Sequence, residues 1–168
     1  TGNIGGITTN DSVLNYTIRF QNTGTSPAMN IAILDTISSK LDLSSLEILA
    51  SSHAYHVELL NGGILKFKFN DINLPDSTNN EPMSHGFIAY RIHQKKGNTL
   101  GDEIKNSASI YFDFNSPVIT NTTLNTIVSS TSVHQINSTF SAIKVYPSPA
   151  QEEILLKWRE SPATWTGS

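Results

Sequence analysis

Residues 70–84 hold a run of carboxylate and amide side chains that could do metal chemistry. Asp71, Asp76, Asn80 and Glu81 stand there at short, irregular spacing. Hard cations such as Ca²⁺ prefer oxygen ligands of this kind. The spacing differs from the regular Asp-x-Asp-x-Asp-Gly loop, and Asp and Asn in turns also hydrogen-bond to their own backbone. The run therefore predicts either a calcium site on these four residues or a loop stabilised by its own hydrogen bonds.

Ser84, His85 and Asp113 are the residue types of a hydrolytic triad, but their spacing argues against one. Ser84 and His85 are adjacent, and neighbouring side chains on a strand point to opposite faces. No Gly-x-Ser-x-Gly elbow is present in the sequence. Glycoside hydrolysis would need two acids converging on a cleft, and the acids here are spread over predicted turns and outward faces. The sequence thus predicts a non-enzyme, with no cofactor other than the calcium considered above.

Aromatic side chains offer a different chemistry, the stacking of sugar rings. Tyr55, Tyr90 and Tyr111 could in principle form such a platform. The alternation predicts that Tyr90 lies in the core and Tyr111 faces outward, where a single exposed tyrosine is typically a cross-strand partner. Carbohydrate binding therefore stays an alternative function, and an exposed row of aromatics would favour it.

A covalent lysine–asparagine cross-link, as in some surface sandwiches, would need a lysine, an asparagine and an acid buried together. Asn106 lies on a predicted apolar face and is a candidate partner. Lys66 and Lys68 alternate away from the core. Asn106 is better explained as a buried amide that bonds to its surroundings.

Composition narrows the function classes. Of the 168 residues, 14 are acidic and 11 basic, which gives a net charge of −3. The sequence thus lacks the excess of basic residues that is typical of nucleic-acid-binding domains. No apolar run approaches the roughly 20 residues of a membrane span. The absence of cysteine excludes disulfides, thiolate metal sites and cysteine nucleophiles. The chain starts at Thr1 without a signal peptide, so we expect a piece of a longer protein.

The elements that must position these residues are strands. Leu14, Tyr16, Ile18 and Phe20 alternate with polar residues, which is the period of a strand with one buried face. Similar patterns, separated by turn residues, predict an all-β fold: an immunoglobulin-like antiparallel β-sandwich of about 7–9 strands, with a closed barrel as the less favoured solution. The predicted strands are 13–21, 29–36, 46–50, 55–60, 64–69, 87–93, 103–114 and 118–127.

Composition also predicts the domain boundaries. Residues 1–12 are a lead-in or an edge strand, and residues 13–127 form the sandwich. Residues 128–141 are rich in Ser, Thr, Asn and Gln and are predicted to be a linker. Residues 142–168 begin a second β unit that has too few strands to be stable alone.

The start of that last unit resembles the C-terminal sorting domain (type A) of the type IX secretion system of the Bacteroidota. The resemblance rests on an aliphatic-Tyr-Pro-Asn-Pro-Ala signature, in which Ser148 replaces the usual asparagine. The matching residues are Val145, Tyr146, Pro147, Pro149 and Ala150. The resemblance implies a partner, the type IX secretion machinery, and a secreted or outer cell-surface location.

Residues 13–127 resemble a β-sandwich repeat of unknown function found upstream of such sorting domains, related to the DUF11-like surface repeats. The resemblance implies a non-catalytic spacer in a surface-attached protein, beside other domains of the parent protein. The alternative is an adhesion module that binds a polysaccharide or another surface partner, with or without calcium. The matching runs are 16–24, 71–77, 80–82, 84–87, 110–115 and 120–121.

Overall fold

A computed structural model describes residues 4–10 and 13–129, and these residues form a β domain with two short helical turns. The all-β prediction is confirmed, but the predicted seven to nine strands are divided into eleven shorter ones within the described ranges. In chain order the elements are β1 (Ile4–Ile7), β2 (Val13–Gln21), β3 (Ile31–Thr36), β4 (Leu41–Ser51), β5 (His56–Leu60), β6 (Ile64–Phe69), α1 (Ser77–Asn80), a 3₁₀ turn (Glu81–Met83), β7 (His85–Gln94), β8 (Glu103–Asn106), β9 (Ala108–Phe112), β10 (Val118–Ile119) and β11 (Thr123–Ile127).

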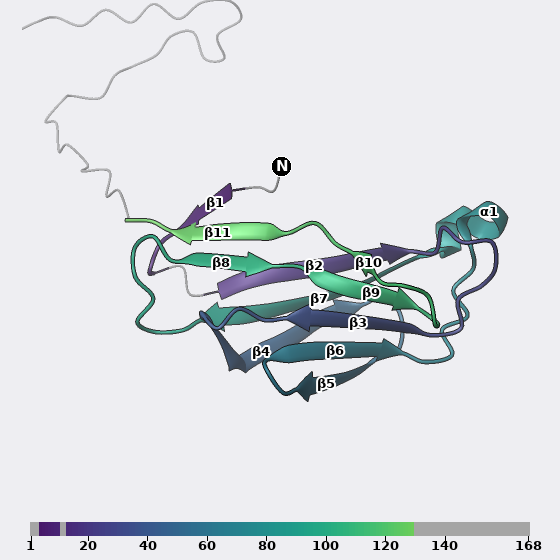
Figure 1. The fold of residues 1–168 in the computed structure, drawn as a ribbon, viewed down its shortest axis with the longest axis horizontal. Coiled ribbons are helices and arrows are strands. Elements are labelled where there is room, and N and C mark those ends of the chain that lie inside the picture. The colour runs from purple at the N-terminus through teal and green to yellow at the C-terminus, as the bar shows by residue number, and fades with distance from the viewer. Residues whose placement is uncertain (1–3, 11–12, 130–168) are drawn as a thin grey trace, which may run out of the picture. The chain divides into compact units, whose positions relative to one another are not determined.

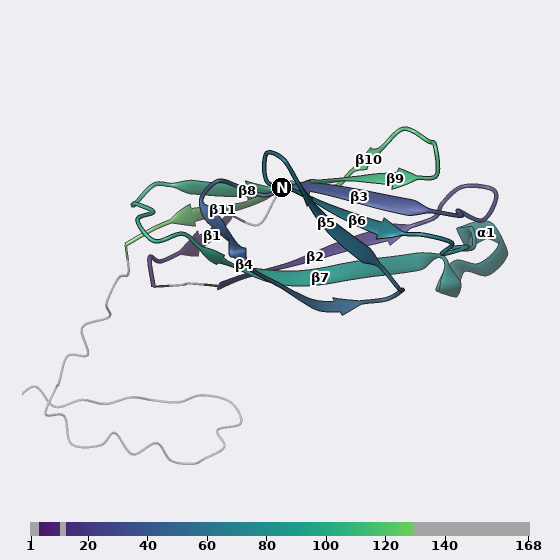
Figure 2. The ribbon, with the colours of Figure 1, turned by 90° about the horizontal axis from the view of Figure 1, so that it is seen from below.

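The strands pack as a sandwich. One layer is the antiparallel sheet β2-β7-β4, and the other contains the sheets β10-β9-β3-β6-β5 and β1-β11-β8 (Figures 1 and 2). β8 and β9 are consecutive pieces of one stretch that is interrupted at Ser107, so the second layer is nearly continuous. The predicted strand 103–114 is therefore split, and it ends at Phe112.

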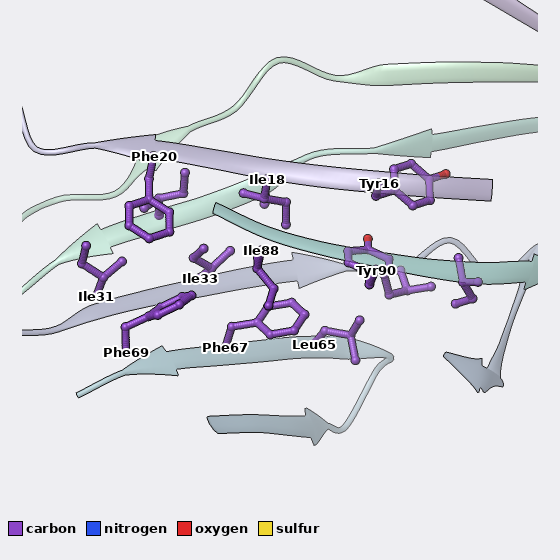
Figure 3. Packing of buried hydrophobic residues seen from close by; sticks show 14 of the residues in the cluster. Tyr16, Ile18, Phe20, Ile31, Ile33, Leu65, Phe67, Phe69, Ile88 and Tyr90 are labelled. Atoms are coloured by element: carbon purple, nitrogen blue, oxygen red, sulfur yellow. The ribbon is translucent and has the colours of Figure 1, made fainter. Parts of the chain in front are cut away.

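Strand β2 shows why the sandwich forms. Leu14, Tyr16, Ile18 and Phe20 are buried, and the residues between them are exposed, as the alternation predicts. Figure 3 shows the side chains of β2 and of its neighbour β7 facing those of β3 and β6 across the core. The Phe20 ring lies edge-on to Phe69, with ring centroids 5.2 Å apart. Burial of each large apolar side chain contributes about 2 kcal/mol, which is what holds the two layers together.

Three features differ from the sequence prediction. A short strand is predicted at 46–50, but the observed strand β4 already begins at Leu41, and its pairing with β7 shifts register twice. Met29 and Phe114, expected on core faces, are 47% and 105% exposed. Both lie outside the strands they were assigned to, since β3 begins at Ile31 and β9 ends at Phe112, before Asp113 turns the chain at a φ of 52°.

The first and last described strands lie side by side. β1 pairs with β11 in a parallel arrangement, with Ile4 opposite Leu124 and Ile7 opposite Ile127. The Ile7 carbonyl also accepts a hydrogen bond from the Val128 N–H at 2.8 Å. Gly5 leaves room for the Asn125 side chain, which would have to move because a Cβ here would lie 2.8 Å from its amide nitrogen. The chain therefore enters and leaves the domain in the same direction. Among the described residues, no helix is long and apolar enough to cross a membrane.

Candidate functional site: a buried polar cluster and a groove beside β2

Four polar side chains from four strands meet inside the apolar core. We call Tyr16, Asp35, Tyr90 and Asn106 the polar cluster. Asp35 is fully buried, and its Oδ2 accepts a hydrogen bond from the Tyr90 hydroxyl at 2.6 Å and another from Asn106 Nδ2 at 3.2 Å. Asn106 Nδ2 also donates to the Tyr90 hydroxyl oxygen at 3.0 Å. The rings of Tyr16 and Tyr90 are neighbours in the core (Figure 3), and their centroids are 5.4 Å apart.

Burial sets the charge state of this cluster. It raises the pKa of the Asp35 carboxyl, and the hydrogen bonds from Tyr90 and Asn106 only partly oppose that effect. Burial, followed by the nearby Asp35 charge, raises the pKa of Tyr16 to about 12 and also raises the pKa of Tyr90. Among the described residues, no cation pairs with Asp35. Burial without a cationic partner therefore shifts the pKa of Asp35 upward, toward the neutral acid.

The polar cluster also contains buried polar atoms that form no hydrogen bond. The Tyr16 hydroxyl, Asp35 Oδ1 and Asn106 Oδ1 are buried without a hydrogen-bond partner. Asn106 and an acid are thus buried together, as a cross-link would need, but the other two residues of the cluster are tyrosines. The described lysines are all at least partly exposed, and Lys68 pairs with Glu58 on the surface. The arrangement fixes the relative positions of four strands rather than forming a lysine–asparagine bond.

A groove of about 660 Å³ runs along β2, on the side that faces away from β7. One wall is β2 with the turn after it, and the other comes from β8 to β11. Its lining is rich in amides and hydroxyls, and Arg19 is the charged residue among the residues that line it. The aromatic rings of Tyr16 and Phe20 are turned into the core, where 7% and 5% of each residue remains exposed. The lining residues outside β2 are Asn22, Thr23, Gly24, Asn106, Ile110, Phe112, Asn115, Ser116, Val118, Thr120, Asn121 and Thr123.

The structure shows what the calcium candidates in residues 70–84 do. Asp76 caps helix α1, because its Oδ1 accepts hydrogen bonds from the backbone N–H groups of Thr78 and Asn79. Its Oδ2 accepts from the Asn79 side chain at 2.7 Å, and this bond is the main reason that the pKa of Asp76 is lowered. Asn80 Oδ1 caps the 3₁₀ turn by accepting from the Met83 N–H.

The two remaining candidates lie at the ends of the run. Glu81 pairs with His85 at 2.8 Å. Asp71 adopts a φ of 52° in an exposed turn, and its N–H donates to the Asn30 side chain. Within residues 4–10 and 13–129, no three His, Cys, Asp or Glu side chains cluster as a metal site would require. The hydrogen bonds match the loop-stabilising alternative, and calcium binding stays a prediction.

The three residues of the possible triad have separate partners. Ser84 is fully buried, and its hydroxyl donates to the Glu81 carbonyl at 2.7 Å. His85 forms the ion pair with Glu81 described above. Asp113 accepts backbone hydrogen bonds from Met29 and Asn30, at 3.1 and 2.7 Å. Ser84, His85 and Asp113 are therefore not hydrogen-bonded to one another as the residues of a catalytic triad would be.

The three candidate tyrosines do not form a common face. Tyr90 lies in the core, as predicted, whereas Tyr55 is 39% exposed in the segment before β5. Tyr111 on β9 is half-buried. The predicted sorting residues Val145, Tyr146, Pro147, Pro149 and Ala150, like the predicted linker from residue 130 onward, lie outside the described residues.

Comparison with known proteins gives a family and a fold. Residues 1–126 match the model of a family described as a domain of unknown function, DUF7619. No curated protein matches the chain.

Among solved structures, the chain is similar to domains D2 and D3 of the major pilin SpaD from Corynebacterium diphtheriae, with 18% identity and a TM-score of 0.51 over 67% of this chain and 46% of that one. It is similar to the structure named BspA_C_WT, with 12% identity and a TM-score of 0.57 over 76% and 45%. A C-terminal fragment of the Streptococcus agalactiae major pilin GBS80 gives 13% identity and a TM-score of 0.50 over 74% and 52%. The chain thus spans about half the length of these proteins, and at such identities the likeness shows the fold.

Proposed function

The chain belongs to the DUF7619 family, and we propose that its domain is a non-catalytic structural module of a cell-surface protein. The polar groups of the described residues support this role because they mostly stabilise the domain itself. The hydrogen bonds among Asp35, Tyr90 and Asn106 tie three strands together inside the core. The acids of residues 70–84 cap turns and form a surface pair. The likeness of the fold to pilin domains is consistent with the same role.

The parallel pairing of β1 and β11 carries this proposal. A spacer between neighbouring domains transmits tension through the two ends of its fold. Because β1 and β11 are parallel neighbours, tension pulls Ile4 and Ile127 in opposite directions along the strands. The hydrogen bonds of the pair are then loaded together in shear. In a hairpin that is peeled from its open end, they would instead break one after another. This geometry suits a module that stays folded under load.

Single-molecule pulling on the full chain tests the proposal. The chain has no cysteine, so engineered cysteine pairs give unique attachment points. One pair at Thr8→Cys and Ser129→Cys is a control that bypasses β1, and attachment at the two chain ends loads β1 against β11. A third pair, at His56→Cys and Lys68→Cys, would pull the β5–β6 hairpin apart from its open end, where these two residues lie opposite each other. We expect end-to-end pulling to need a several-fold higher unfolding force than either control. Equal forces in all three geometries would contradict the spacer role.

The finer part of the proposal concerns export. We propose that the parent protein is a secreted, surface-attached protein of the Bacteroidota that leaves the cell through the type IX system. The resemblance around Tyr146, Pro147 and Pro149 supports it. The test is surface immunodetection of the tagged parent protein in strains with and without the type IX translocon. We expect surface signal only in the intact strain, and a further loss with Pro147→Ala and Pro149→Ala. Unchanged display in the translocon mutant would contradict this route.

A second candidate function is adhesion, and the groove beside β2 favours it. The groove offers side-chain amides and hydroxyls to a surface partner along one complete strand. Of the aromatic residues in its wall, Phe112 is half-buried, whereas Tyr16 and Phe20 face the core. Binding of a soluble polysaccharide to the full chain, measured by calorimetry and abolished by Asn121→Ala, would support adhesion to sugar. The absence of any heat of binding would leave the spacer role alone.

A further inference from the structure

Strand β2 has a neighbour on one edge only. Within the described residues it pairs with β7 and with no other strand. The Asn22 N–H donates to the Ser84 carbonyl at 2.9 Å in the same register, which identifies Asn22 and Ser84 as a hydrogen-bonded pair. In an antiparallel ladder such pairs alternate, so every second residue of β2 directs its backbone groups toward β7. Those residues are Leu14, Tyr16, Ile18 and Phe20.

The alternation leaves the other residues of β2 facing away from β7. The backbone N–H and C=O groups of Asn15, Thr17 and Arg19 point to the free edge, along which the groove runs. The far edge of β7 supports this assignment, because the backbone N–H groups of Phe87 and His93 donate to serine hydroxyls of β4 and its following turn. The groove therefore has a ladder of unpaired backbone groups along one wall.

The other strand edges of the described domain carry features that discourage pairing. β1 and β8 have four residues each, and β10 has two and follows Pro117 directly. β4 is long but shifts register twice. β5 has five residues and carries the Glu58–Lys68 ion pair. Short, irregular or charged edges are the usual protection against unwanted strand addition. β2 differs, because its nine residues pair with β7 without a register shift.

The layer opposite β2 limits what can reach this edge. The sheet that contains β2 has three strands, and the other layer continues past it as β11 and β1 (Figure 1). A second folded domain that approached edge-on would meet those strands. A single extended segment would fit between β2 and the wall formed by Thr120, Asn121 and Thr123.

We propose that the free edge of β2 and its groove receive an extended polypeptide segment of a partner protein, which adds a fourth strand to the β2-β7-β4 sheet. Main-chain hydrogen bonds to Asn15, Thr17 and Arg19 would supply the affinity, as in other cases of strand addition. Arg19 lies on the outer face with its guanidinium 5.8 Å from the centre of the Phe87 ring, so a carboxylate opposite Arg19 complements the groove. A strand would use the whole row of backbone groups along β2, whereas a sugar could stack only on the half-buried ring of Phe112, because the rings of Tyr16 and Phe20 are buried. This inference does not depend on the spacer role.

The first test measures amide hydrogen exchange by NMR on the full chain. In the free protein, the N–H groups of Asn15, Thr17 and Arg19 should exchange much faster than those of Tyr16 and Ile18, which bond to β7. The probe is a synthetic copy of residues 85–94, whose alternation already matches β2. Its addition should slow exchange at the three edge amides by at least tenfold. Edge amides that are slow in the free protein, or unchanged at millimolar peptide, would overturn the proposal.

Modified peptides provide matched controls without changing the protein. In the β2–β7 register, Phe87, Ala89 and Arg91 of the peptide would direct their backbone toward the free edge. N-methylation at these residues should weaken binding at least tenfold, whereas N-methylation at Ile88 and Tyr90 should leave it within about twofold. Equal effects of the two methylation patterns would overturn strand addition.

Charge and ligand class are tested in the same assay. A peptide with Phe87→Glu places a carboxylate opposite Arg19 and should bind several-fold more tightly at low salt. The Thr17→Pro variant of the full chain removes one edge N–H and should lose at least tenfold in affinity, whereas Thr17→Val should bind normally. If dextran protects the edge amides and the peptides do not, the groove is a sugar site and the proposal is wrong.

Discussion

Replacing Asp35 by asparagine is expected to stabilise the domain at neutral pH. Asp35 is fully buried with no cation beside it, and burial raises its pKa. An acid whose pKa is raised on folding contributes full stability below its unfolded pKa, near 4, and loses that contribution as the pH rises toward the folded pKa. At pH 7 the free energy of unfolding of the wild-type domain therefore lacks part or all of this contribution. Asp35→Asn keeps the shape and removes the charge.

The size of the effect follows from two terms. Each unit of upward pKa shift costs the wild-type protein about 1.4 kcal/mol at high pH. The new amide also keeps an oxygen that can accept from Tyr90 and Asn106, and each such bond is worth about 1 kcal/mol. We therefore expect Asp35→Asn to raise the free energy of unfolding by about 1–3 kcal/mol at pH 7, and the melting temperature by about 3–10 °C.

Urea denaturation of both proteins at several pH values between 4 and 8 checks this prediction. The stability difference should shrink toward pH 4, because the unfolded wild-type protein then also begins to protonate Asp35. Glu103→Gln, which removes an exposed carboxylate paired with Lys105, is the matched control and should show no such trend. A variant that is less stable by the same amount at every pH would refute the reasoning, because it would mean that Asp35 is ionised and favourably bound.

Three further changes test the core and the loop. Tyr90→Phe removes the shortest hydrogen bond to Asp35 and should lower the free energy of unfolding in urea by about 1–3 kcal/mol. Gly86→Ala places a methyl group against the Phe20 ring and should cost about 1–3 kcal/mol in the same assay; a neutral effect would contradict the packing of β2 on β7. Asp76→Ala removes the cap of α1 and should lower the melting temperature by about 2–5 °C, whereas excess chelator should leave it unchanged, and a calcium-dependent rise would show that the loop binds the ion after all.

Most of the fold follows from the period of the sequence. β2 and β6 have the bounds that their alternation predicts, because one face of each strand is strongly apolar and no competing turn residue interrupts it. β4 was harder to predict because its leucines repeat every third residue, and its two register shifts break the period of two. The parallel pairing of β1 with β11 had no local signal, since it joins residues more than 100 positions apart.

The sequence predicts only part of the polar cluster. Asn106 stood out as an amide on an apolar face, and it is buried as predicted. Asp35 carried the same signal, because it follows Ile31 and Ile33 at spacings of two, but it was not singled out. The groove could not be predicted, since it depends on how far one layer extends past the other.

Removal of β1 tests the central claim most directly, namely that this domain is a structural module whose terminal strands resist tension. The measurement compares end-to-end pulling of the full chain with that of a chain lacking residues 1–7. The account predicts that the unfolding force of the shortened chain falls several-fold, because the β1–β11 shear pair is gone while the polar cluster and the core remain. An unfolding force that is unchanged by the deletion would contradict it.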